Sequence, residues 1–164
     1  MRTIVVIAHD IRSTHNVGSL LRTCEGLGVS KLYFTGYTPY PPVAHDTRLP
    51  HLAEKLGRQI HKTALDAETL VDWEYAPDIS MLLDTLKRDG FQLAALEQSS
   101  GSTPLQTYQP SANVALLLGR EVEGIEPELL AQCDITLEIP MFGHKESFNV
   151  VQAAAMALYQ CRFA

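Results

Sequence analysis

Short, nearly continuous runs of apolar residues, separated by segments with helical periodicity, are the feature that most restricts how this chain can fold. Such runs occupy residues 3–8 (TIVVIA), 31–35 (KLYFT), 91–96 (FQLAAL), 113–118 (NVALLL) and 135–139 (ITLEI). A strand covered by helices on both faces carries apolar side chains in both directions, whereas a strand with one solvated face alternates. The pattern therefore predicts an α/β fold with a parallel sheet.

The segments between these runs have the spacing of amphipathic helices. We expect helices at 16–27, 79–88, 127–133 and 147–163, and a mixed, partly helical segment at 46–65. Asn16 is the expected cap of the first helix, and Gly28 is its expected end. The last helix is apolar in nearly every direction, whereas a surface helix has a polar face. A subunit interface would cover its second face, and a wholly internal helix is the alternative.

Length and composition indicate one ordinary globular domain. The chain has 164 residues, of which 46% are hydrophobic and 20% are charged, and we expect a single domain over 1–164. No apolar run with a cleavage site follows the N-terminus, and no stretch approaches the ~20 apolar residues of a membrane span. The three cysteines are far apart and odd in number, which indicates reduced thiols. We therefore expect a cytoplasmic protein without a signal peptide.

Charge limits how this chain could bind a nucleic acid. The net charge is -6, so an RNA partner would need a local basic patch. Residues 46–62 carry four Lys or Arg against two Asp or Glu, whereas residues 63–89 carry two against seven. Two solvated faces of opposite charge explain this equally well. If the patch binds RNA, the phosphate contacts are expected from Arg48, Lys55, Arg58 and Lys62, together with Arg12 and Arg120 near the strand ends.

Familiar catalytic motifs are missing. The sequence has no GxxxxGK[ST] loop, no GxGxxG after the first strand and no GxSxG turn. Its six histidines do not cluster at zinc-ligand spacing, and no cysteine lies at a matching interval, so no metal site is expected.

Polar and glycine residues instead follow three of the expected strands, where ligands bind in open α/β sheets. The three groups are Asn16, Gly18 and Arg22; Gly119, Arg120, Glu121 and Gly124; and His144, Lys145, Ser147 and Asn149. Gly18 and Arg22 share a helix face, and the missing side chain is expected to leave room for a substrate beside the guanidinium. Each group also has a structural interpretation: a turn, a helix start, or an ion pair of Arg22 with Glu25 or Glu121.

These three segments resemble the motifs of the SpoU/TrmH branch of the SPOUT RNA methyltransferases. NxGxxxR is present at 16–22, an apolar strand leading into GxExxG at 116–124, and IPM followed by SxNV at 139–141 and 147–150. The order agrees and the resemblance extends along the whole chain. Phe148 stands where the family more often has leucine. The additional N-terminal RNA-binding domain that many relatives carry is not expected here.

The resemblance implies a parallel-sheet SPOUT fold with a C-terminal trefoil knot, which general topology rules would not suggest. It also implies a homodimer with S-adenosylmethionine as cofactor, bound around Leu96, Gly119, Ile139, Met141 and Phe148. The implied reaction is methyl transfer to a ribose 2′-hydroxyl of tRNA or rRNA. Arg22 would be the catalytic residue, and Asn16, Glu121, Ser147 and Asn149 would orient it and shape the pocket. Glu121 would belong either to its own site or to that of the other subunit.

The chemical role of Arg22 follows from the pKa of a free guanidinium, which lies above ~12. We expect it to stabilise the developing alkoxide while holding the neighbouring phosphate. Action as a base is the alternative, if the dimer buries it near other cations. Two other functions stay open: a non-catalytic RNA-binding relative, and a small-molecule enzyme on a nucleotide-binding α/β fold. The complete motifs speak against the first, and the acidic charge mildly supports the second.

Overall fold

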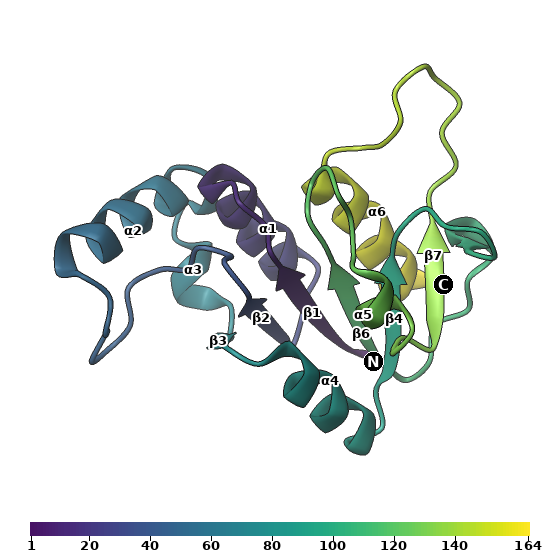
Figure 1. Ribbon diagram of the computed structural model, residues 1–164, viewed down its shortest axis with the longest axis horizontal. Coiled ribbons are helices and arrows are strands. Elements are labelled where there is room, and N and C mark those ends of the chain that lie inside the picture. The colour runs from purple at the N-terminus through teal and green to yellow at the C-terminus, as the bar shows by residue number, and fades with distance from the viewer.

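A seven-stranded parallel sheet forms the centre of the computed structural model, which describes residues 1–164 (Figure 1). The order across the sheet is β3-β2-β1-β6-β4-β7-β5, and every pairing is parallel. The strands are β1 (Thr3–His9), β2 (Lys31–Thr35), β3 (Trp73–Ala76), β4 (Gln92–Leu96), β5 (Thr103–Pro104), β6 (Asn113–Leu118) and β7 (Ile135–Glu138). The predicted α/β class with a parallel sheet is confirmed.

Helices cover both faces of the sheet. They are α1 (Thr14–Gly26), α2 (Pro50–Ala64), α3 (Ala67–Leu70), α4 (Ile79–Arg88), α5 (Pro127–Leu130) and α6 (Val150–Phe163), with a 3₁₀ turn at Leu105–Thr107. One core lies between the sheet and α1, α2, α3 and α6, and a smaller core lies beneath α4 and α5. Alternate residues of β1 point into the two cores, Val6 into the first and Ile7 into the second. This arrangement explains why the central strands are continuously apolar.

The observed element boundaries correct several of the sequence predictions. Helix α1 begins before Asn16, because the Ser13 hydroxyl accepts a hydrogen bond from the Asn16 N–H at 3.2 Å and so caps the helix. Helix α6 begins at Val150 after its cap Asn149, and α5 stops at Leu130. The helical part of 46–65 is α2. Strand β3 was not predicted, since it is only four residues long and pairs with β2 at the edge of the sheet.

Gly18 does not leave the space that its missing side chain suggested. It is buried where α1 crosses α2, and a Cβ there would lie 2.1 Å from Thr63 Oγ1 and 2.3 Å from the Ile60 carbonyl oxygen. The glycine therefore allows two helix backbones to approach closely. The expectation of a substrate beside Gly18 is wrong, because α2 occupies that volume.

Helix α6 buries one face in this chain and leaves another exposed. Ala154, Ala157 and Leu158 are fully buried in the larger core. Tyr159 and Phe163 are 61% and 65% exposed, and their ring centroids lie 4.6 Å apart. The alternative of a wholly internal helix is thus wrong. No helix combines the length and apolar character needed to cross a bilayer.

The three cysteines are free, as the sequence indicated. Burial raises the pKa of the Cys161 thiol to about 11 and that of Cys24 still further. Both thiols lie in the core and remain protonated at neutral pH, so they contribute packing rather than reactivity.

Candidate active site

A cavity of about 240 Å³ lies at the carboxyl ends of β4, β6 and β7. The loops that follow these three strands supply its polar walls, and the first turn of α6 supplies part of its floor. Its lining includes Leu96, Glu97, Gly119, Arg120, Glu121, Val122, Ile139, Glu146, Ser147, Phe148 and Val150. Two of the three sequence motifs therefore meet at one cavity, in the position where open α/β sheets bind ligands.

The lining of this cavity combines apolar side chains with an excess of acidic ones. Half of its 16 residues are hydrophobic, and they include Leu96 and Leu118 at the ends of their strands and Leu137 next to the end of β7. Four glutamates, at positions 97, 121, 138 and 146, face a single basic residue, Arg120. This composition suits a ligand with an apolar ring and a positive charge, and it disfavours one with several phosphates.

Two glycines and one glutamate shape the wall that follows β6. A Cβ at Gly119 would lie 2.5 Å from Ile125 Cγ1, so the loop folds back closely over its own start. Gly124 has φ +73°, a left-handed conformation that glycine adopts without strain. Glu97 Oε2 accepts a hydrogen bond from the Ile125 N–H at 2.9 Å and ties this loop to the end of β4. Sequence analysis did not single out Glu97, although it directly follows an apolar strand.

The first sequence motif reaches the other two through a chain of hydrogen bonds. Asn16 Nδ2 donates to Glu121 Oε1 at 3.2 Å, and Asn149 Nδ2 donates to Asn16 Oδ1 at 3.2 Å. Asn149 also caps α6, because its Oδ1 accepts from the Val151 N–H at 2.8 Å. The structure thus brings together three of the five residues expected in the catalytic set, each from a different motif.

Arg22 lies elsewhere. Its side chain is exposed and borders a shallow hollow with Lys62 and Thr63, and it is not part of the cavity lining. The ion pair considered for Arg22 and Glu121 is not formed, since the Glu121 carboxylate accepts from Asn16 instead. Among the other expected residues, Ser147 and four of the five cofactor positions line the cavity, whereas Met141 does not.

Arg48 is held within the fold and is not a free phosphate ligand. Its guanidinium pairs with the Asp46 carboxylate at 2.6 Å and donates to the carbonyl oxygens of Tyr40 and Pro41 at 2.9 and 3.1 Å. It also lies 3.7 Å from the centroid of the Tyr40 ring. The Arg48 contacts hold the pKa of the Asp46 carboxyl well below its usual range. Four of the five N–H donors of the Arg48 guanidinium are thus used within the fold, so Arg48 is less available to a phosphate than an exposed arginine, and its contact with RNA stays a prediction.

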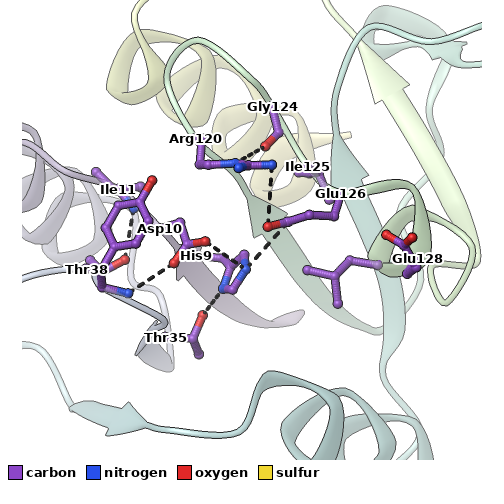
Figure 2. A network of polar contacts seen from close by, with 12 residues as sticks. His9, Asp10, Ile11, Thr35, Thr38, Arg120, Gly124, Ile125, Glu126 and Glu128 are labelled. Carbon is purple, nitrogen blue, oxygen red and sulfur yellow. Dashed lines mark hydrogen bonds and ion pairs between the residues drawn. The ribbon is translucent and has the colours of Figure 1, made fainter.

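The other three arginines expected to contact RNA differ in availability. Arg12 and Arg58 are exposed; the Arg12 guanidinium lies 5.9 Å from the Tyr37 ring, and Arg58 forms a loose 3.9 Å ion pair with Glu54. Arg120 is partly buried, donates to the Gly124 carbonyl at 3.3 Å and pairs with Glu126 at 3.5 Å (Figure 2). Arg12 and Arg58 are therefore more available to contact a phosphate than Arg120.

Known proteins resemble this chain in sequence and in fold. A tRNA (guanosine(18)-2'-O)-methyltransferase of Aquifex aeolicus is 24% identical over 98% of this chain and 69% of its own length. The 23S rRNA (guanosine-2'-O-)-methyltransferase RlmB of Acinetobacter baylyi is 28% identical over 98% of this chain, which spans 60% of that relative. The fold also resembles that of an AdoMet-bound rRNA methyltransferase from Sinorhizobium meliloti, with a TM-score of 0.80 and 22% sequence identity. The superposition covers 98% of this chain and 56% of the methyltransferase chain.

A family model settles the relationship. The model describes the SpoU rRNA Methylase family and matches residues 3–159, nearly the whole chain. The match includes all three motifs and every strand of the sheet. This chain is a member of the SpoU rRNA Methylase family.

Proposed function

We propose that this protein transfers a methyl group from S-adenosylmethionine to a ribose 2′-hydroxyl of tRNA or rRNA. The observation that carries the proposal is the single cavity at which the segments after β4, β6 and β7 meet, with the Asn16–Glu121–Asn149 contacts joining the first motif to it. Two relatives bear names that specify 2'-O-methylation, one of tRNA and one of rRNA. We further propose that 1–164 acts as one domain in the cytoplasm.

The cavity fits S-adenosylmethionine better than it fits a phosphate-bearing cofactor. The adenine ring is matched by the apolar walls around Leu96, Ile139 and Phe148, and the positive groups by the surrounding glutamates. Met141 lies outside the lining, and its contact with the cofactor stays a prediction.

When bound, S-adenosylmethionine supplies an electrophilic methyl group on a positively charged sulfur. A ribose 2′-hydroxyl held beside that methyl group would have to lose its proton, to solvent or to a basic group, as its oxygen is methylated. The developing negative charge on oxygen calls for a cation, and Arg22 is our candidate. Asn16, Glu121, Ser147 and Asn149 are proposed to position the substrate and the cofactor at the mouth of the cavity.

Arg22 would act in the cavity of a second copy of the chain. Arg22 is exposed on α1 and lies outside the cavity of its own chain. In a dimer, the cavity of the partner chain would lie next to it. The exposed aromatic face of α6, which packs beside α1, offers an apolar surface for a homodimer. Lys62, beside Arg22, and the exposed Arg12 and Arg58 would then contact phosphates of the same RNA.

A trefoil knot in the C-terminal part of the chain is also part of this proposal. Strand β7 lies between β4 and β5, so the chain returns to the middle of strands laid down earlier. The loops after β4, β6 and β7 and the start of α6 all line one cavity. Such crowding is what threading of one segment through another would produce.

The test is a transfer assay with radiolabelled S-adenosylmethionine and unmodified tRNA and rRNA. We expect labelled RNA, with the label on a ribose 2′-oxygen after nuclease digestion. RNA whose target nucleotide is a 2′-deoxynucleotide should accept no methyl group. Tight RNA binding without transfer, despite measured cofactor binding, would instead establish the non-catalytic alternative. Binding of neither RNA nor cofactor would contradict the proposal as a whole.

A further inference from the structure

The imidazole of His9 lies between two carboxylates at the carboxyl end of β1 (Figure 2). His9 is only 6% exposed, and its Nε2 lies 3.4 Å from Asp10 Oδ2 and 3.6 Å from Glu126 Oε2. The three facing atoms all lie within 4.8 Å of one another. Three groups that bind metals thus converge on one point, and the cavity lining includes none of them.

The side chains of His9 and Asp10 are each held in place by a hydrogen bond of the polar atom that does not face the cluster. His9 Nδ1 is hydrogen-bonded to Thr35 Oγ1 at 2.8 Å, which orients the ring and directs Nε2 toward the carboxylates. Asp10 Oδ1 accepts from the Tyr37 N–H at 3.0 Å, which leaves Oδ2 directed toward His9. Metal-binding histidines are usually oriented in this way, by a hydrogen bond to the ring nitrogen that does not bind the metal.

Glu126 completes the set and carries an unsatisfied atom. Its Oε1 pairs with the Arg120 guanidinium at 3.5 Å, while its Oε2 is buried and accepts no hydrogen bond. A buried carboxylate oxygen without a partner is costly, so such atoms ordinarily face a hydrogen-bond donor or a cation. The oxygen concerned is the one that faces His9 Nε2.

The spacing agrees with a shared metal ion. Ligand bonds of about 2.0–2.2 Å in a tetrahedral site place neighbouring ligand atoms roughly 3.3–3.5 Å apart. The two distances from His9 Nε2, 3.4 and 3.6 Å, are close to this range. One imidazole and two carboxylates form a donor set that suits zinc, and water would fill the fourth position.

We propose that His9, Asp10 and Glu126 bind one Zn²⁺ ion. A neutral imidazole that donates through Nδ1 presents a lone pair at Nε2 to two negative oxygens, and a cation between them removes that repulsion. The competing occupant is a proton on His9, which would make the contacts ordinary ion pairs.

The site would brace the wall of the cavity. Ala8 of β1 pairs with Leu118 of β6, so the segments that follow these two strands begin side by side. Glu126 follows Ile125, whose N–H is held by Glu97 at the cavity. A metal bound to Glu126 therefore links β1 to the loop that carries the GxExxG motif, and should stabilise that loop.

A second cluster in the chain provides a matched control. His61, Asp66 and Glu68 also lie within 4.8 Å of one another, but His61 and Asp66 have side chains that are 53% and 78% exposed. His61 Nδ1 already contacts Glu68 Oε1 at 2.6 Å, a direct hydrogen bond that leaves no room for an ion. That hydrogen bond raises the pKa of His61, which further opposes metal binding.

The experiment is calorimetric titration of ZnCl₂ into tag-free protein stripped of metal by a chelator. We expect one equivalent per chain with a Kd of about 1 µM or tighter, and a higher melting temperature with zinc. His9→Gln and Glu126→Gln should each weaken binding by about 100-fold or more, because each removes a ligand. His61→Gln should leave binding unchanged.

Thr35→Val is a milder variant that keeps all three ligands and removes only the hydrogen bond to Nδ1. It should weaken zinc binding by about tenfold, and circular dichroism should show a native fold. No stoichiometric binding by the wild type would overturn the site in favour of a proton on His9. Binding that survives in both ligand variants, or is lost in His61→Gln, would also overturn it. None of these readouts depends on methyl transfer, so the two proposals fail separately.

Discussion

Individual arginines of this chain differ in the contacts that their guanidinium groups make. Arg22 is exposed on α1, whereas Arg48 is enclosed by Asp46 and by two backbone carbonyls. Arg22 is therefore the arginine that we propose to act on the substrate, whereas the contacts of Arg48 support the local fold.

Arg22→Ala should lower methyl transfer by about 100-fold or more, the scale for loss of a main charge-stabilising group. Cofactor affinity should hardly change, because Arg22 is proposed to face the ribose of the RNA and not the adenosine of the cofactor. Arg22→Lys should not restore activity, since an ammonium cannot hold hydroxyl and phosphate together as a planar guanidinium does. Turnover and melting temperature are measured on one preparation. Normal turnover with a lowered melting temperature would leave Arg22 a structural role only.

Arg48→Ala should destabilise the protein and leave the intrinsic RNA affinity of the folded chain nearly intact. It removes hydrogen bonds to a carboxylate and to two carbonyls, which together contribute about 2 kcal/mol, so the melting temperature should fall by roughly 5 °C. Arg58→Ala, on the exposed face of α2, should do the reverse: unchanged melting, weaker RNA binding and a smaller dependence of affinity on salt. If Arg48→Ala reduces affinity as much as Arg58→Ala without loss of stability, the assignment of Arg48 is wrong.

At the level of elements, the crossing of α1 and α2 depends on one glycine. This contact places Arg22 and Lys62 around the same hollow. A side chain at Gly18 would collide with the backbone of α2 as well as with Thr63, so rotation of one side chain cannot relieve the clash.

Gly18→Ala should therefore cost about 1–3 kcal/mol of folding free energy, the usual range for overpacking. Gly26→Ala is the matched control, because a Cβ there meets nothing within 4 Å. Urea unfolding of the two variants measures the difference. Equal stability of both would show that α2 moves freely against α1, and that the crossing is not fixed.

At the level of the whole molecule, the exposed aromatic pair on α6 is the basis of the proposed homodimer. A homodimer that covers Tyr159 and Phe163 should be disrupted by Tyr159→Ser combined with Phe163→Ser, since their exposed rings offer much of the apolar area on that face. Light scattering should report a dimer for the wild type and a monomer for the double variant, with similar circular dichroism. A wild-type monomer at tens of micromolar, roughly where stable homodimers persist, would contradict the proposal.

Dimerisation and catalysis can be tested together by mixing inactive variants. If Arg22 serves the cavity of its partner, Arg22→Ala and Asn149→Ala chains refolded together should regain activity, because each mixed dimer contains one intact site. Each variant alone should remain inactive. Failure of the mixture, with mixed dimers demonstrated by mass spectrometry, would place Arg22 in the site of its own chain.

What the sequence determined by itself is the class of fold and the edge of the sheet that carries polar loops. Hydrophobic periodicity is a local property, set by whether a strand is covered on one face or on two, so it can be interpreted without knowing distant contacts. The apolar runs at 3–8 and 113–118 indicated central strands, and the motifs after them lie at the cavity or at the Asn16–Glu121–Asn149 contacts.

Only the tertiary structure decided how side chains from distant segments pair. The close approach of α2 to Gly18, the enclosure of Arg48, and the meeting of His9 with Glu126 all depend on register and packing. Gly18 was interpreted from the sequence as leaving room for a substrate, and that interpretation changed once α2 was seen to fill the space. The physical reason is that the free energy of a polar or tightly packed contact depends on distances of a few tenths of an ångström between remote segments, which local periodicity does not encode.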